Sequence, residues 1–153
     1  MRTADDIILL GEELVQRYKL AAPIPVKVDD GGVGGGVVDR LHQLKRNEPE
    51  RLWWLEIYPV IFGQRIKHRY YYDSTTYMLA VVKRILPDDN DLAAQLSGRK
   101  YFLTENSRIR VESKKEMKKR GRPSPDEADC LALLCLPVKL SKKSEMKGAK
   151  PHD

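Results

Sequence analysis

The spacing of apolar residues along the first half of the chain alternates between the helical and the strand period. Apolar side chains recur at helical spacing in residues 3–20 and again in residues 37–46, whereas those of residues 24–28 alternate as in a strand. A second strand-like run follows at residues 51–63. The glycine-rich residues 31–36 are expected to form a loop between the first strand and the second helix. This order of elements predicts an α/β fold.

The second half of the chain predicts shorter elements. Asp73 is expected to cap a helix that Pro87 ends, and Gly98 is expected to end the next helix. A hairpin with a polar turn follows, and then one or two helical turns and a last helix that Ser124 is expected to cap. The expected helices lie at 73–86, 88–98, 114–121 and from 125 onward, and the hairpin strands lie at 101–103 and 109–111.

Two aspartates distinguish the last of these helices. Asp126 and Asp129 are one turn apart on the same face, while nearly every other side of the helix is apolar. A buried carboxylate is costly unless a positive group compensates its charge. The pair therefore predicts a bound cation, and carboxylate oxygens are the ligands that Mg²⁺ prefers.

Another acidic position lies at the end of the first predicted strand, where Asp29 and Asp30 precede the glycines. Sites of α/β proteins lie at the carboxyl ends of strands, although Asp-Gly also begins ordinary turns. The glycines do not complete a dinucleotide-binding fingerprint or a P-loop, so nucleotide binding is not expected. If Asp29 converges with Asp126 and Asp129, two metal ions about 3.5–4 Å apart could promote hydrolysis of a phosphodiester.

Positive charge is concentrated in two segments. The whole chain has a net charge of +6, while residues 114–122 carry +5 and residues 139–150 carry +4. The segment 139–153 is expected to be a basic, disordered tail. The segment 114–122 directly precedes Asp126, and contact with a polyanion is expected there. Its cations are Lys114, Lys115, Lys118, Lys119, Arg120 and Arg122.

The remaining composition restricts the class of protein. A length of 153 residues fits one domain, and no apolar run is long enough to cross a membrane. Cys130 and Cys135 lack neighbours at metal-ligand spacing and are expected to be buried thiols in a reducing cytosol. Trp54 is expected to pack against the sheet, whereas the tyrosines at 70–72 are open between packing and base stacking.

Two stretches resemble a known family. VDDGGVGGGVVDRL at 28–41 and RVESKKEMKKRGRPSPDEADCLALL at 110–134 are similar to the C-terminal nuclease domain of the large terminase subunits of tailed bacteriophages. The likeness extends over most of residues 3–137. It implies an RNase H-like mixed sheet with flanking helices, and a Mg²⁺- or Mn²⁺-dependent endonuclease that cleaves double-stranded DNA during packaging in the host bacterial cytoplasm, where a prophage could also encode it.

The resemblance also assigns roles to residues. Asp29, Asp126 and Asp129 correspond to metal-binding catalytic acids, with the principal ligand of the last helix left open between Asp126 and Asp129. The six cations of 114–122 would hold the DNA backbone without reading its sequence. The portal, the small terminase subunit and an ATPase domain are the partners that the family implies.

The chain departs from the family pattern at its start. The first catalytic aspartate of the family lies on a first strand that has no counterpart here, nor do the two strands next to it. Residues 1–138 are therefore expected to be a partial nuclease domain with an open sheet edge, from a truncated or split reading frame. Two alternatives stay open: a non-catalytic DNA-binding or assembly remnant of that subunit, and a stand-alone resolvase-like nuclease.

Overall fold

The computed structural model describes residues 2–31, 33–82 and 88–137. The described residues divide into two compact units, one formed by those up to Val60 together with Pro137 and the other by those from Ile61 to Leu136. The basic tail expected at 139–153 and the helix stop expected at Pro87 lie outside the described residues.

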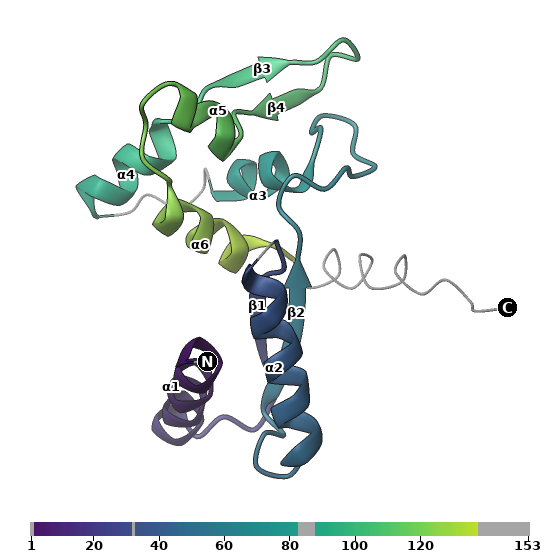
Figure 1. Cartoon of the computed structure of the whole chain (residues 1–153), viewed down its shortest axis with the longest axis vertical. Helices are drawn as coiled ribbons and strands as arrows, with labels where there is room; N and C mark the ends of the chain where they lie inside the picture. Colours follow the sequence, from purple (N-terminus) through teal and green to yellow (C-terminus); the bar gives the residue numbers. More distant parts are fainter. Residues whose placement is uncertain (1, 32, 83–87, 138–153) are drawn as a thin grey trace, which may run out of the picture. The chain divides into compact units, whose positions relative to one another are not determined.

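The first unit is a strand–helix–strand motif preceded by a helix (Figure 1). Its elements are α1 (Arg2–Tyr18), β1 (Ile24–Asp29), α2 (Val33–Asn47) and β2 (Leu55–Val60). The two strands are parallel, with Ile24 opposite Leu55 and Asp29 opposite Val60. Among the described residues β1 pairs with β2 alone, so its other edge has no strand partner there.

Trp54 is the centre of this unit's core. Its side chain is fully buried, as expected, and it packs with apolar residues of both helices and of β2. Gly11 of α1 lies against the indole, because a Cβ at this position would come within 2.0 Å of a ring carbon. A helix-interior glycine is normally unfavourable, and here it makes room for the largest core side chain. The other fully enclosed members of the core are Ala4, Leu41, Leu52 and Leu55.

The loop in the glycine-rich segment is shorter than the sequence predicted. α2 begins at Val33, so three glycines expected in the loop belong to its first turns. Gly34 explains the difference, since a Cβ there would lie 1.5 Å from the main-chain carbonyl oxygen of Asp29. The helix can start this close to the strand only because the residue has no side chain.

The described residues of the second unit form four helices and a hairpin (Figure 1). The hairpin strands are antiparallel and have the predicted bounds, and the segment of three tyrosines runs beside β4, with Ile109 N donating to Tyr70 O. The helix α6 packs against α3 and α4, and its Ala128 and Ala132 are buried. The elements are α3 (Ser74–Val82), α4 (Asn90–Ser97), β3 (Tyr101–Leu103), β4 (Ile109–Val111), α5 (Lys114–Lys119) and α6 (Asp126–Cys135).

Asp73 caps α3 as predicted. Its Oδ1 accepts hydrogen bonds from the backbone N–H of Thr76 at 2.8 Å and from the hydroxyl of the same residue at 2.7 Å. The Thr76 hydroxyl oxygen in turn accepts from Val111 N at 3.0 Å. A cap that serves the helix start therefore also ties α3 to the hairpin.

The predicted class, a fold that contains both helices and strands, is confirmed. The described residues form six helices and two separate two-stranded sheets, one parallel and one antiparallel. None of these helices is both long and apolar enough to cross a membrane.

Candidate functional site

The Lys114 ammonium lies between two of the predicted site carboxylates. Its Nζ is 3.0 Å from Asp126 Oδ1 and 2.9 Å from Asp129 Oδ2. Lys114 is the first residue of α5, and the two aspartates lie one turn apart at the start of α6. The pair of carboxylates therefore meets at one point, and that point holds a cation supplied by the protein.

A second cation compensates the buried member of the pair. Arg99 Nη2 donates to Asp129 Oδ1 at 2.6 Å, and only 4% of the Arg99 side chain and 7% of the Asp129 side chain are exposed. Asp129 thus has an ion pair on each oxygen. These two contacts supply the positive charge that the sequence required for a carboxylate on this helix.

Asp126 has a different environment from Asp129. Its side chain is 74% exposed, so the expectation of two buried acids is wrong for this residue. Ser124 Oγ donates to Asp126 Oδ1 at 2.6 Å, and this bond, followed by the Lys114 contact, lowers the Asp126 pKa. Ser124 therefore binds the carboxylate instead of capping the helix, whose N-cap is Pro125.

The Lys114 pKa reflects both its partial burial and its carboxylate partners. Burial lowers the pKa of the ammonium, but the hydrogen bonds and charges of Asp129 and Asp126 outweigh it, so the pKa is raised overall. The ammonium is therefore held in its charged form, which is the form that the two acids stabilise.

Asp29 occupies the predicted strand end in the first unit. It is the last residue of β1, is partly exposed, and its Oδ1 accepts from Gly31 N at 3.0 Å. Asp30 follows it and donates its N–H to Val60 O, a structural contact. Asp29 belongs to one unit and the Asp126–Asp129 pair to the other. Within each unit, the described residues contain no group of three His, Cys, Asp or Glu side chains that could hold one metal ion.

The helix α5 has one anchored side and one exposed side. Ser113 and Glu116 form a capping box, in which Ser113 Oγ accepts from Glu116 N and Glu116 accepts from Ser113 N. Met117 is buried, and Glu116 also accepts from both terminal nitrogens of Arg110. The hydrogen bonds from Arg110 and Ser113 hold the Glu116 pKa down to about 2.

Arg120 is a structural residue. Its Nε donates to Glu112 at 2.9 Å, and its Nη2 donates to Glu112 and to the carbonyl oxygen of Gly98. Glu112 is buried, and the Arg120 bond is the main reason that its pKa falls to about 2. Arg120 therefore links the hairpin to the end of α4. The sequence predicted a DNA contact for Arg120 and did not indicate this structural link.

The four remaining cations of the segment form what we call the basic surface: Lys115, Lys118, Lys119 and Arg122. All four are exposed, and none has an ion pair with an acid among the described residues. The segment's one acid, Glu116, is occupied by Arg110 and Ser113. The positive charge of the basic surface is thus left open to solvent.

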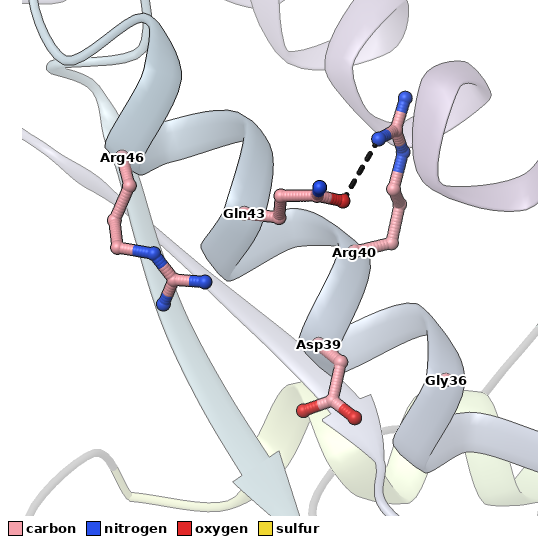
Figure 2. A pocket seen from close by; sticks show the side chains of 5 residues that line it. All are labelled: Gly36, Asp39, Arg40, Gln43 and Arg46. Carbon is pink, nitrogen blue, oxygen red and sulfur yellow. Dashed lines mark hydrogen bonds between the residues drawn. The ribbon is translucent and has the colours of Figure 1, made fainter.

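A shallow hollow of about 460 Å³ lies along α2 and contains none of the predicted site residues (Figure 2). Arg40 Nη1 donates to Gln43 Oε1 at 3.0 Å along its wall. All of its lining comes from one helix face: Gly36, Asp39, Arg40, Gln43 and Arg46. A single polar helix face offers no convergent set of groups for catalysis.

Several site features have no counterpart in the sequence prediction. Arg99 carries no sequence signal, because it is thirty positions from its partner and follows the expected helix end without any motif. The sequence predicted a DNA contact for Lys114 and did not indicate its ion pairs with Asp126 and Asp129. The expected burial of the thiols is wrong for Cys130, which is exposed, while Cys135 is partly buried.

Comparison of the chain with protein-family models and with curated proteins finds no match to either.

Proposed function

We propose that this chain binds double-stranded DNA through the basic surface, as part of a nuclease domain of the terminase large-subunit type. The observation that carries the proposal is the set of four exposed cations, Lys115, Lys118, Lys119 and Arg122, without acidic partners in the described part of the chain. Cations in ion pairs would have to break those pairs to bind phosphate, whereas these four are available.

The arrangement suits a sequence-independent contact. Three of the four cations lie on α5, a short helix fixed by Met117 and its capping box, so they reach solvent from a rigid support. Lysines and arginines that meet the backbone position a duplex without reading its bases. Packaging a whole genome requires contacts of this kind, because every sequence must pass.

The test compares two double variants that each remove two positive charges. Lys118→Gln/Lys119→Gln changes the basic surface, and Arg40→Gln/Arg46→Gln changes the α2 face in Figure 2. Fluorescence anisotropy with a labelled duplex of arbitrary sequence is measured over a salt series. The first variant is expected to reduce the slope of log affinity against log salt by about 2, since each phosphate that the protein no longer neutralises removes about 1. Equal slopes in both variants would refute the interface.

Metal-dependent cleavage is the second candidate function. The observation that favours it is the meeting of Asp126 Oδ1 and Asp129 Oδ2 at one cation, within 3.0 Å of Lys114 Nζ. Carboxylate oxygens are the donors that Mg²⁺ and Mn²⁺ take, and Arg99 would keep Asp129 oriented. In the family that the sequence resembles, the position of Asp29 holds a further metal-binding acid. Bound ions would supply an activated water and stabilise the leaving oxygen.

Nicking of supercoiled plasmid tests this candidate. The purified chain is incubated with Mn²⁺ or with EDTA, beside the variant Asp29→Ala/Asp126→Ala. Nicking that requires Mn²⁺ and disappears in the variant supports the nuclease. Absence of nicking, together with duplex binding that weakens as salt rises, supports the non-catalytic DNA-binding reading. The proposed partners in either case are duplex DNA, the portal, the small terminase subunit and an ATPase domain, in the bacterial cytoplasm.

A further inference from the structure

The tyrosine segment extends the hairpin on the side of β4. Ile109 N donates to Tyr70 O at 2.7 Å, and Tyr72 N donates to Ile109 O at 2.9 Å. This bridge pairs Tyr71 with Ile109, so the two side chains point to the same face. On that face the Tyr71 ring meets the Tyr77 ring of α3 edge-on, with the ring centres 5.9 Å apart. Of the three tyrosines, Tyr71 is therefore the one that packs towards the helix.

The opposite face carries aromatic rings beside arginines. Arg110 points to this face together with its cross-strand partner Phe102, and its guanidinium lies 5.2 Å from the centre of the Phe102 ring. Tyr72 points there too, because it follows Tyr71 in the segment. Its ring has two arginine contacts, with Arg65 at 3.5 Å and Arg108 at 5.4 Å. We call this surface the arginine–aromatic face: Arg65, Tyr72, Phe102, Arg108 and Arg110.

Two aromatic rings on or next to this face are open to solvent. Phe102 is 42% exposed. Tyr70, beside the face, is 55% exposed and has the Arg69 guanidinium 5.3 Å from its ring centre. Every nucleic-acid base has a π-face that can stack on such rings, and arginine adds a cation–π contribution. The exposed rings therefore suit unstacked bases.

The cations around these rings are not neutralised by carboxylates. Residues 64–72 contain three lysines or arginines and no acid. Arg110 is held by Glu116, so it supports the Phe102 ring and is not free to bind phosphate. Four other cations of the region have no ion pair with an acid among the described residues: Arg65, Lys67, Arg69 and Arg108. Their charge is complementary to that of a nucleic-acid backbone.

We propose that the arginine–aromatic face binds single-stranded DNA. Bases stack on the exposed rings of Phe102 and Tyr70, and the four cations without acidic partners bind the phosphates. The choice of DNA rests on the proposed function, because β4 ends at Val111 and α5, which carries most of the basic surface, begins at Lys114. The second unit thus offers one surface for a duplex and another for an unpaired strand.

Fluorescence anisotropy with labelled single strands tests the stacking. The unmodified chain is titrated with a strand of about 12 thymidines, a length within the usual range of such sites, and with an abasic strand of the same length. The thymidine strand is expected to bind at least about fivefold more tightly, the lower bound for one stacked base. Equal affinity for the two strands would overturn the proposal, and this comparison needs no variant.

Two adjacent residues of β3 provide matched variants. Tyr101 is 76% exposed and lies on the face opposite to Phe102. Phe102→Ala should lose at least about fivefold in affinity for the thymidine strand and keep its affinity for the abasic strand. Tyr70→Ala should show the same loss, whereas Tyr101→Ala should bind both strands like the unmodified chain. With folding checked by circular dichroism, an equal effect of Phe102→Ala and Tyr101→Ala would overturn the proposal.

Further arms separate this inference from the proposed function. Lys118→Gln/Lys119→Gln should weaken duplex binding and preserve the ratio between the thymidine and abasic strands, and Phe102→Ala should preserve duplex affinity. If the lysine variant leaves duplex binding unchanged while Phe102→Ala still weakens the thymidine strand, the proposed duplex interface fails and the single-strand site stands. An RNA strand of uridines that binds more tightly than a DNA strand of deoxyuridines would overturn the assignment to DNA.

Discussion

The Arg99 guanidinium donates to the Asp129 carboxylate at 2.6 Å, and both side chains are almost completely buried. The pair joins the segment after α4 to the first turn of α6. A buried ion pair is expensive to break, because removal of one partner leaves the other charge without compensation. Asp129 is therefore a residue that holds the second unit together, whatever further role it has.

Replacement of Arg99 should be strongly destabilising. Arg99→Met leaves Asp129 buried with Lys114 as its remaining cation, and we expect a loss of about 3 kcal/mol in the free energy of unfolding. The double variant Arg99→Met/Asp129→Leu removes both charges and should be more stable than Arg99→Met alone. Urea denaturation measures both. Equal stability of Arg99→Met and the unmodified chain would show that the pair does not support the fold.

The two aspartates of α6 should respond differently to the same substitution. Asp129→Asn leaves Arg99 buried without its carboxylate and is expected to cost about 3 kcal/mol. Asp126→Asn changes a side chain that is 74% exposed, and its cost should stay below about 1 kcal/mol. Thermal or urea unfolding of the two variants provides the comparison. If Asp126→Asn were as destabilising as Asp129→Asn, the difference in their burial would not govern stability.

Glu112 and Glu116 make stability depend on acid pH. Both have a pKa of about 2 in the folded chain, below the ordinary 4.5, so their contribution is fully present above about pH 4.5. It is lost as the pH falls towards 2, because protonation breaks the bonds to Arg120 and Arg110. Urea midpoints should therefore drop over this range, and the drop should be shallower in Glu112→Gln. An unchanged pH dependence in that variant would contradict the assignment.

Two adjacent glycines of α2 give a matched pair of substitutions. A Cβ at Gly34 would meet the Asp29 carbonyl oxygen at 1.5 Å, whereas at Gly35 the nearest atom is a side-chain oxygen of Asp30 at 3.4 Å. Gly34→Ala should cost about 3 kcal/mol, the upper part of the range for overpacking. Gly35→Ala should be neutral or stabilising by less than about 1 kcal/mol, since alanine favours helix. Equal unfolding midpoints for the two would contradict the close approach of α2 to β1.

Local patterns predicted most of the secondary structure. The hairpin strands have the expected bounds, and Asp73 caps α3 as its position suggested, because turns and caps depend on residues close together in the sequence. The predicted start of α2 is wrong because the glycines were interpreted as a loop from local sequence alone. Gly34 is in fact helical, and its lack of a side chain allows α2 to pack closely against the end of β1.

The charges of the candidate site were harder to predict. The sequence indicated that Asp129 needs a cation, but Arg99 and Lys114 come from distant segments whose approach depends on packing. A count of cations in 114–122 also could not separate Arg120, tied to Glu112, from the four residues of the basic surface. Periodicity identifies which residues share a face and gives no information on their partners.

The salt dependence of duplex affinity tests the central proposal most directly. A variant with glutamine at Lys115, Lys118, Lys119 and Arg122 keeps Lys114, Arg99 and Arg120 in their ion pairs, so the fold should be preserved, as circular dichroism can check. If the basic surface binds DNA, the slope of log affinity against log salt should fall by about 3.6, or about 0.9 for each phosphate that is no longer neutralised. A folded variant that retains both the affinity and the slope of the unmodified chain would contradict the proposal.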